Sequence, residues 1–207
     1  SEYCMLGNGF KDGTSGKLSR MDYALWLAKV IHHDLAIGNA TGWHYWNSYE
    51  PGSADNPRYF LIAMNPRRTV NADTLFTITK NLWALGHYSL FVRPGMYRVE
   101  TSRNDGLADT AVAQNIMISA FKDTAEKKLI INMINYTTEN KNATLILQGI
   151  TKGKTMLLVN RYVTSEKEGD DLKPYPLNSN GNSTTKNNSH NVDLPARSIT
   201  TYMFRPM

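Results

Sequence analysis

The residue pattern changes near residue 94, and this change limits the possible folds more than any other feature. Before it, apolar residues recur at helical spacing, and all four tryptophans of the chain lie there. After it, short β-branched and aromatic runs are separated by turn residues, and helical spacing is absent. The sequence therefore predicts a chain in two parts, an α/β domain over residues 1–94 and an all-β domain over residues 95–207.

Residues 19–35 are predicted to form the first helix of the upstream domain. Ser19 is a suitable N-cap, and Asp22 follows it at the spacing of a capping box. Apolar side chains recur three and four residues apart, and Gly38 is suited to end the helix. The next expected elements are an aromatic strand, an extended segment and a second helix, at residues 40–47, 59–64 and 73–85. This order of elements is typical of a βα-repeat.

The downstream domain is predicted to be an antiparallel β-sandwich, because short strands follow one another at nearly regular spacing. The expected strands lie at residues 95–101, 115–122, 128–137, 143–149, 154–164 and 197–205. Asn, Ser and Thr dominate residues 177–191, which we expect to form a long exposed loop between the last two strands.

Composition excludes several classes of protein. The chain has 207 residues, of which 41% are hydrophobic, and this is enough for a packed core. Its net charge of +5 is spread along the chain, whereas a nucleic-acid-binding protein concentrates basic residues on one element. No stretch approaches about 18 uninterrupted apolar residues, so no membrane span is expected. Cys4 is the only cysteine, which excludes an internal disulfide.

The aromatic run Gly42–Asn47 is a candidate sugar-binding strand. Strand alternation places Trp43 and Tyr45 on one face, and His44 and Trp46 on the other. Aromatic rings stack on the apolar faces of sugars, and Asn, His and Tyr side chains bond hydroxyl groups. The same pattern suits a core strand whose indole rings fill volume, and the residues alone leave both interpretations open.

Other reactive residue types give weaker signals. Glu2 suits the C-terminal end of a barrel strand, where (β/α)8 enzymes keep catalytic groups, but its position alone favours a solvated terminus. His32 and His33 are adjacent, which does not suit a shared metal on a helix, and Cys4 belongs to no catalytic motif. A chain rich in Asn, Ser and Thr also produces Asn-x-Ser/Thr sequons by chance, here at Asn39, Asn135, Asn142, Asn182 and Asn187.

Four segments together resemble glycoside hydrolase family 30. They are Ser1-Glu2-Tyr3-Cys4, Ala40-Thr41-Gly42-Trp43-His44-Tyr45-Trp46, the run from Leu82 to Gly95, and the run from Leu194 to Thr201. In that order they are similar to the seventh barrel strand with its nucleophile, the eighth strand, the last barrel helix with its exit, and the closing sandwich strand. The run from Leu82 to Gly95, which is similar to the end of the barrel, is the most specific of the four segments. It differs from the family pattern at one position, Val92, where the family usually has Ile.

The resemblance implies the C-terminal remnant of a (β/α)8 TIM barrel over residues 1–94, followed by an antiparallel β-sandwich. It also implies a retaining hydrolase, in which one carboxylate is the nucleophile and a second serves as acid and then base. Glu2 matches the nucleophile, whereas the family's acid/base Glu lies upstream, so we expect this fragment alone to be inactive. The implied substrate-binding residues are Tyr3, Trp43, His44, Tyr45 and Trp46, of which Tyr3 and His44 orient either Glu2 or the substrate.

The resemblance also sets expectations about substrate and partners. Within the family, the chain resembles bacterial members described as endo-β-1,6-galactanase-like or xylanase-like, which implies a polysaccharide or oligosaccharide substrate. Carboxylates carry this chemistry, so neither a metal nor an organic cofactor is implied. Such a substrate implies a secreted, periplasmic or cell-surface location. An incomplete barrel leaves apolar faces open, and we expect the upstream barrel segment or a second copy to cover them. The alternative is a non-catalytic carbohydrate-binding or structural β-sandwich module.

Overall fold

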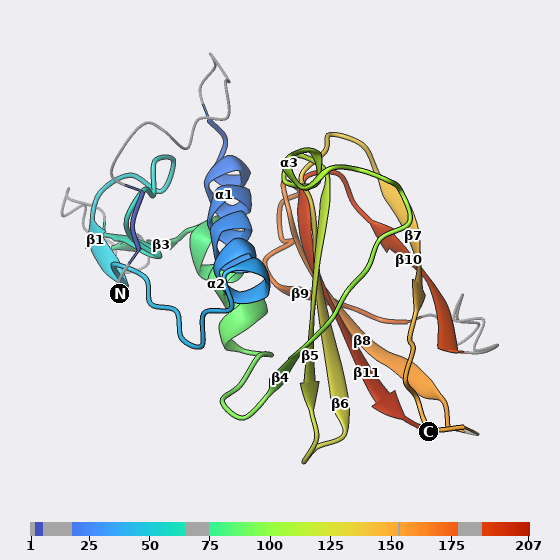
Figure 1. Cartoon of the computed structure of the whole chain (residues 1–207). Helices are drawn as coiled ribbons and strands as arrows, with labels where there is room; N and C mark the ends of the chain where they lie inside the picture. The colour runs from blue at the N-terminus through green and yellow to red at the C-terminus, as the bar shows by residue number, and fades with distance from the viewer. Residues whose placement is uncertain (1–2, 6–17, 65–74, 153, 178–187) are drawn as a thin grey trace. The chain divides into compact units, whose positions relative to one another are not determined.

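The structure is a computed structural model of mixed α/β type with mostly antiparallel sheets. The described residues are 3–5, 18–64, 75–152, 154–177 and 188–207. The chain divides into two compact units, Ser1–Gly86 and His87–Met207 (Figure 1). Among the helices in the described ranges, none is long and apolar enough to cross a membrane.

The two units divide at Gly86, whereas the sequence placed a domain boundary at residue 94. The reason is that residues after Gly86 pack within the second unit. The His87 ring contacts Thr164 and Thr201, and the Phe91 ring lies 4.7 Å from the Tyr162 ring, centroid to centroid. The domain limits themselves stay a prediction.

Two helices belong to the first unit. Helix α1 (Arg20–His32) begins at the predicted N-cap, where Ser19 Oγ accepts the Asp22 N–H and Asp22 Oδ2 accepts the Ser19 N–H. This confirms the predicted capping box. A π-helical turn, η1 (His33–Ile37), continues α1 up to Gly38. Helix α2 (Lys80–Ser89) runs from the first unit into the second.

The predicted start of the second helix at residue 73 is wrong. A three-residue strand, β3 (Phe76–Ile78), precedes α2 and pairs antiparallel with β2 (Ile62–Met64). The Thr77–Ile78 pair favours extended backbone, and the hydrogen bonds with β2 outweigh the helical spacing of the leucines. Strand β1 (Tyr49–Pro51) completes this small sheet by pairing in parallel with β2.

The predicted aromatic strand at residues 40–47 is reduced to one parallel bridge, between Tyr3 and Tyr45. The remaining residues of this run form no ladder in the described part of the chain. The extended segment expected at residues 59–64 is present in part, as β2.

The second unit contains a six-stranded antiparallel sheet in the order β4-β5-β6-β11-β8-β9, and a two-stranded sheet of β10 and β7. The bounds are β4 Tyr97–Val99, β5 Ile116–Asp123, β6 Lys128–Asn135, β7 Lys141–Ile146, β8 Met156–Ser165, β9 Lys173–Tyr175, β10 Ser189–Leu194 and β11 Ser198–Pro206. A short helix, α3 (Asp109–Val112), precedes β5. All six predicted strands are present. Strands β9 and β10 were not expected, and β10 occupies the end of the predicted loop at residues 177–191.

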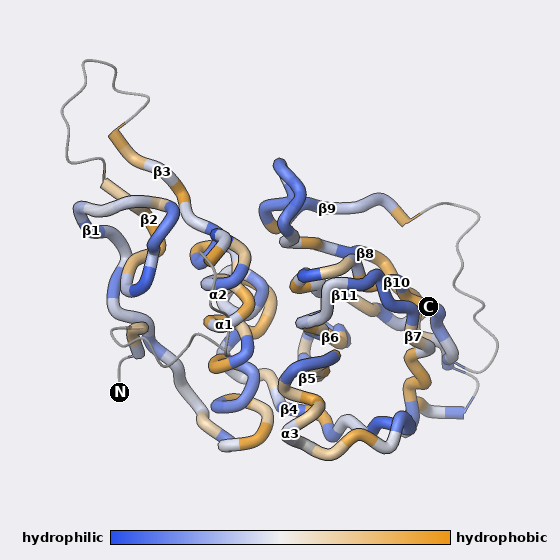
Figure 2. Tube along the Cα trace, turned by 90° about the horizontal axis from the view of Figure 1, so that it is seen from above, coloured by the Kyte–Doolittle hydropathy of each residue, from blue (hydrophilic) through white to orange (hydrophobic). Residues whose placement is uncertain are grey.

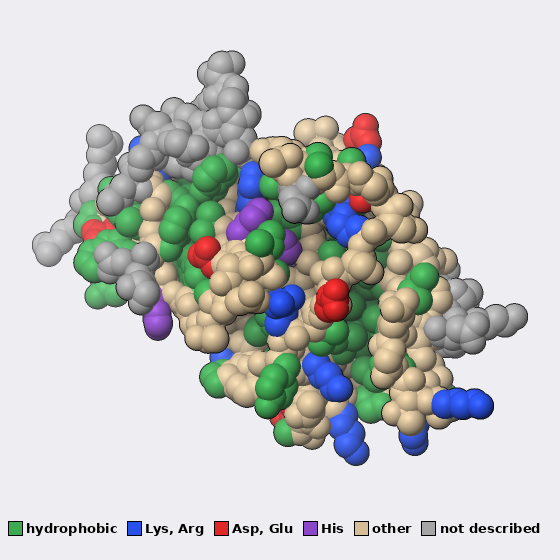
Figure 3. Space-filling model, viewed as in Figure 1, with side chains coloured by type: hydrophobic (Ala, Val, Ile, Leu, Met, Phe, Trp, Pro, Cys, Tyr) green, Lys and Arg blue, Asp and Glu red, His purple; other side chains and the backbone are tan. Residues whose placement is uncertain are grey.

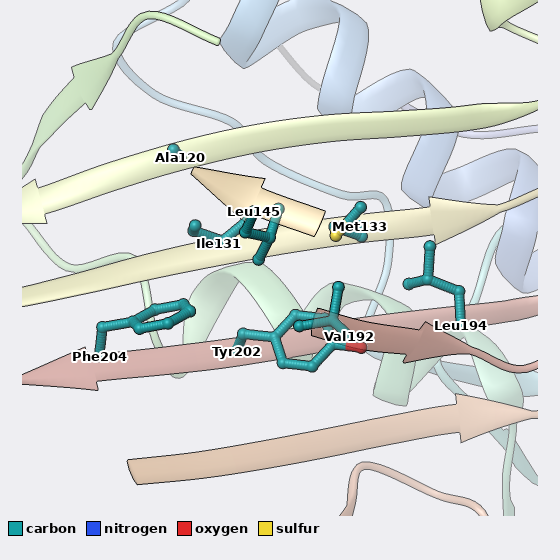
Figure 4. Packing of buried hydrophobic residues seen from close by; sticks show 8 residues of the cluster. All are labelled: Ala120, Ile131, Met133, Leu145, Val192, Leu194, Tyr202 and Phe204. Carbon is teal, nitrogen blue, oxygen red and sulfur yellow. The ribbon is translucent and has the colours of Figure 1, made fainter. Parts of the chain in front are cut away.

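The hydrophobic core of the second unit draws on both sheets. Figure 4 shows its eight buried side chains, Ala120, Ile131, Met133, Leu145, Val192, Leu194, Tyr202 and Phe204. They come from β5, β6 and β11 of the large sheet and from β7 and β10 of the small one. Along β10, buried and exposed side chains alternate, and Figure 2 shows hydrophilic and hydrophobic residues mixed along the strands of this unit. Removing this apolar surface from water is the main stabilising contribution to the unit.

The opposite face of the large sheet carries a buried polar network around His87. Thr201 Oγ1 donates to Asn132 Oδ1 at 2.6 Å, so His87 Nδ1–H donates to Thr201 Oγ1 at 2.7 Å. In a neutral ring with its proton on Nδ1, Nε2 accepts from Thr164 Oγ1 at 3.0 Å, and Thr164 Oγ1 also accepts the Leu172 N–H. The network therefore assigns the neutral Nδ1–H tautomer to His87.

We expect acid to weaken the second unit through His87. Burial lowers the pKa of His87 from its ordinary 6.5 to about 3. The folded protein then keeps the ring neutral at pH 5, whereas the unfolded chain protonates it. Stability from this group is complete above about pH 6.5 and is lost as the pH falls toward 3. At pH 5 the loss amounts to about 2 kcal/mol.

Urea titrations at pH 7 and pH 5, followed by NMR of β6 and β11 amides, measure this effect. His87→Gln keeps a donor and an acceptor and is expected to remove most of the loss. His44→Gln is the matched control, because His44 is exposed and belongs to the first unit. An unchanged pH dependence in His87→Gln would assign the effect to other groups.

Candidate functional site

Two chain segments lie side by side at the edge of the first unit, Tyr3–Met5 and Trp43–Trp46, here called the strand pair. The Tyr3 N–H donates to the His44 carbonyl at 3.1 Å, and the Trp46 N–H donates to the Tyr3 carbonyl at 2.9 Å. The Met5 N–H donates to the Arg58 carbonyl at 3.0 Å. The first two bonds join the segments in parallel, whereas the third ties Met5 to a residue outside the pair.

One face of the strand pair packs on α1 and η1, which are together called the helical layer. Trp26 of α1 donates its indole N–H to Tyr3 Oη at 3.0 Å, and Trp43 donates its indole N–H to Asp34 Oδ2 at 2.8 Å. The Trp43 ring lies 5.8 Å from the Tyr3 ring and is stacked 6.1 Å from the Tyr45 ring, centroid to centroid. Strand alternation accounts for this grouping, since Tyr3 and Tyr45 are bridge partners and Trp43 is two residues from Tyr45.

The tyrosines of this face act as hydrogen-bonding groups and not as bases. Tyr45 Oη donates to the Arg58 carbonyl at 3.0 Å. Burial raises the pKa of Tyr45 well above its ordinary value, and it also raises the pKa of Tyr3 despite the bond from Trp26. Both hydroxyls therefore stay protonated at neutral pH.

The other face of the strand pair carries His44 and Trp46, and both are exposed. The Trp46 side chain is 47% exposed, so its ring is available for stacking on an apolar surface. Asn47 follows, and its Nδ2 donates to Glu50 Oε1 at 2.7 Å. Strand alternation in the sequence already separated Trp43 and Tyr45 from His44 and Trp46, and the structure adds Tyr3 to the first pair.

Several residues of this region were missed as site candidates. Two of them, Trp26 and Asp34, lie in the predicted first helix. Glu50 lies between the predicted segments at residues 40–47 and 59–64, so none of the three belongs to a motif named above. Only Trp26 could have been found from the sequence, because its indole N–H is a polar group on the apolar face of α1 and needs a hydrogen-bond partner there. Glu2, the predicted nucleophile, lies outside the described residues. Cys4 is half-buried.

Metal-binding geometry was searched across the described ranges, and no group of three or more His, Cys, Asp or Glu side chains there could hold a metal ion. The adjacent His32 and His33 have separate environments. Burial lowers the pKa of His32 to about 4, and His33 Nδ1 lies 2.7 Å from the Lys29 carbonyl within α1.

A hollow in the second unit has a volume of about 350 Å³ and lies on β7 and β10. Its lining residues are Asn142, Ala143, Thr144, Asn191, Val192 and Asp193. Polar side chains can bond hydroxyl groups, but no aromatic ring is among these lining residues to stack on a sugar. The strand pair combines both features and is the better candidate site.

A family model described as O-Glycosyl hydrolase family 30 matches residues 1–56, which include the whole strand pair. The chain is similar to glycoside hydrolase family 30. It corresponds to the C-terminal part of family 30 members. The name Glucuronoxylanase XynC belongs to a Bacillus subtilis relative that is 25% identical over 203 residues, 95% of this chain and 38% of that protein. The chain thus spans well under half the length of the curated relatives it matches.

Solved structures give the same result for the fold. A conserved exported protein from Bacteroides fragilis is 27% identical, with a TM-score of 0.73 over 98% of this chain and 38% of that one. The family 30 subfamily 8 xylanase Xyn30A from Clostridium acetobutylicum shares the fold at 22% identity, with a TM-score of 0.64 over 99% of this chain and 41% of that one.

Proposed function

We propose that this chain is the C-terminal part of a retaining glycoside hydrolase that cleaves β-glycosidic bonds in a polysaccharide. The strand pair carries the proposal. It combines two parallel barrel-like segments, an exposed Trp46 and an exposed His44, and Glu2 directly precedes Tyr3 in the sequence. In this proposal residues 1–94 end a (β/α)8 barrel and residues 95–207 form its β-sandwich.

Glu2 is the proposed nucleophile. Its carboxylate attacks the anomeric carbon, the glycosidic C–O bond breaks, and the leaving oxygen takes a proton from a second carboxyl group. Water then gives a proton to that second group and displaces Glu2, which restores the original configuration. The second carboxyl group is proposed to lie on a segment upstream of this chain, so the chain alone is expected to be inactive.

His44 and Trp46 are the proposed substrate contacts that the geometry supports best. They lie on the face of the strand pair opposite the Tyr3 ring, and both are exposed, so a sugar can stack on the Trp46 ring there. Substrate contacts by Tyr3, Trp43 and Tyr45 stay predictions.

Two polysaccharides are the main candidate substrates. The sequence resemblance included endo-β-1,6-galactanase-like members, which favours β-1,6-galactan. The names of the relatives, a glucuronoxylanase and a xylanase, favour xylan. A secreted or cell-surface location is proposed with either substrate, and the relative from Bacteroides fragilis is described as exported.

Hydrolysis of β-1,6-galactan, β-1,6-glucan and xylan tests the function. We expect an upstream-extended protein to release reducing ends from one of these glycans with retained anomeric configuration, seen by ¹H NMR, while the 207-residue chain releases none. Inverted products would contradict the proposed mechanism. Binding of a glycan without hydrolysis by the extended protein would instead support the carbohydrate-binding alternative.

The first unit is proposed to need a partner, either the upstream barrel segment or a second copy. Large apolar side chains are exposed there, at Ile37, Tyr49, Phe76 and Ile78. In the view of Figure 3, apolar side chains also gather at the surface beside the grey, undescribed residues. Exposed apolar faces of this kind mark interfaces.

Hydrogen exchange of the 207-residue chain tests the need for a partner. We expect amides of β5, β6 and β11 to exchange far more slowly than those of α1 and the β1-β2-β3 sheet. Adding the upstream segment is expected to protect the first unit selectively. A monomer whose α1 amides are as protected as those of β6 would contradict this proposal.

A further inference from the structure

We infer that Tyr3 and Trp43 are positioning residues, which hold the strand pair against the helical layer and thereby place the nucleophile. This inference rests on the proposed function, in which Glu2 attacks the sugar. From the sequence, Trp43 was a predicted substrate contact, and Tyr3 was predicted to orient either Glu2 or the substrate.

Tyr3 is bound through both its backbone and its side chain. Its N–H and carbonyl bond His44 and Trp46 at 3.1 and 2.9 Å, and its hydroxyl accepts the Trp26 indole N–H at 3.0 Å. Trp26 belongs to a helix whose Leu25 and Leu27 are fully buried, so the donor is held in place. One residue from the nucleophile, the chain is therefore fixed at three points. This precision matters, because a misplacement of about 1 Å costs roughly 100-fold in rate.

Trp43 fixes the second segment of the strand pair to the same helical layer. Its indole N–H donates to Asp34 Oδ2 at 2.8 Å, and Asp34 lies in the π-helical turn η1. The Asp34 carbonyl also accepts the Ala40 N–H at 2.9 Å, which holds the chain as it leaves that turn. Such π-helical turns recur at functional sites.

The polar tips of these side chains are already engaged within the protein. The Trp43 N–H is used by Asp34, and the Tyr3 hydroxyl is used by Trp26. The Trp43 ring is stacked on Tyr45 at an interplanar angle of 12°, which covers one face of the indole. Burial that raises the pKa of Tyr3 agrees with this inward placement. By contrast, Trp46 is 47% exposed on the opposite face.

Tyr3→Phe and Trp26→Phe in the upstream-extended protein test the inference, because each removes one partner of the Tyr3–Trp26 bond and keeps an aromatic ring. We expect each to lower kcat about 10-fold with KM within about twofold of the parent. The double variant is expected to be no worse than either single one, since both remove the same bond. Trp43→Phe is expected to show the same kcat-selective loss, whereas Trp46→Phe is expected to raise KM.

Tyr202→Phe is the matched control. The Tyr202 hydroxyl donates to the Asp193 carbonyl at 2.6 Å within the second unit, so this variant also removes one tyrosine hydrogen bond. We expect it to lower the thermal midpoint while leaving kcat unchanged. If Tyr3→Phe behaves like Tyr202→Phe, or raises KM at constant kcat, the inference is wrong. If Glu2→Gln keeps turnover, the proposed function fails instead, so the two failures are distinguishable.

Discussion

Replacing Glu2 by Gln in an upstream-extended protein is expected to lower kcat by at least about 10³-fold, which corresponds to about 4 kcal/mol in the barrier. The amide has almost the shape of the carboxylate but is a far poorer nucleophile, so the glycosyl-enzyme intermediate does not form. Substrate binding is expected to persist, because the proposed contacts at His44 and Trp46 are untouched. Single-turnover hydrolysis and calorimetric binding of the glycan that the parent cleaves measure the two quantities separately.

A chemical rescue sharpens this experiment. In Glu2→Ala, azide can occupy the vacated space and attack the anomeric carbon, with departure of the leaving group as its alcohol. The product is then a glycosyl azide of inverted configuration, and we expect the rate to rise with azide concentration. Glu126→Gln is the matched control, since Glu126 is an exposed carboxylate in the second unit that bonds Lys128. Near-normal turnover of Glu2→Gln would remove Glu2 as the nucleophile.

Replacing Asn135 by Ala is expected to destabilise the second unit by about 3 kcal/mol. Asn135 is fully buried at the end of β6. Its Nδ2 donates to the carbonyls of Glu139, Leu194 and Pro195, and its Oδ1 accepts from the backbone and hydroxyl of Thr137. Alanine leaves these buried groups without their partner. Urea titrations followed by the β6 and β11 amides give the free energy of unfolding.

Asn142→Ala is the matched control for this substitution. Asn142 is also the first residue of a sequon, but it is exposed on β7, and we expect its replacement to change stability by less than about 0.5 kcal/mol. Equal losses in the two variants would contradict the assigned role of Asn135. The same contacts explain why the folded protein does not present Asn135 for glycosylation, because its Nδ2 is the atom that would be modified.

Sequence reasoning was accurate where neighbours in the chain decide the structure. The capping box of Ser19 and Asp22 depends on residues three apart, and it is present as predicted. Strand alternation in β5, β6, β8 and β11 was visible for the same reason. Strand β10 also alternates, with His190, Val192 and Leu194 buried, but its polar composition hid this pattern in a predicted loop.

The predictions were wrong where contacts with a distant part of the chain determine the local structure. Helix α2 begins late because residues 76–78 pair with β2 instead of extending the helix. The aromatic run at residues 40–47 forms one bridge and no strand, although its composition favours a strand. Local propensity differs by about 1 kcal/mol or less per residue, so contacts with another segment readily override it.

The sequence by itself determined the family motifs, the helix cap and the fact that residues 43–46 have two different faces. Tertiary structure alone decided which of those faces packs inward. Alternation separates Trp43 and Tyr45 from His44 and Trp46, but it cannot say which pair meets a helix. That choice depends on the partners that Trp26 and Asp34 supply from α1 and η1. Their hydrogen bonds and ring contacts form only once the chain has folded, and they leave Trp46 as the ring exposed to solvent.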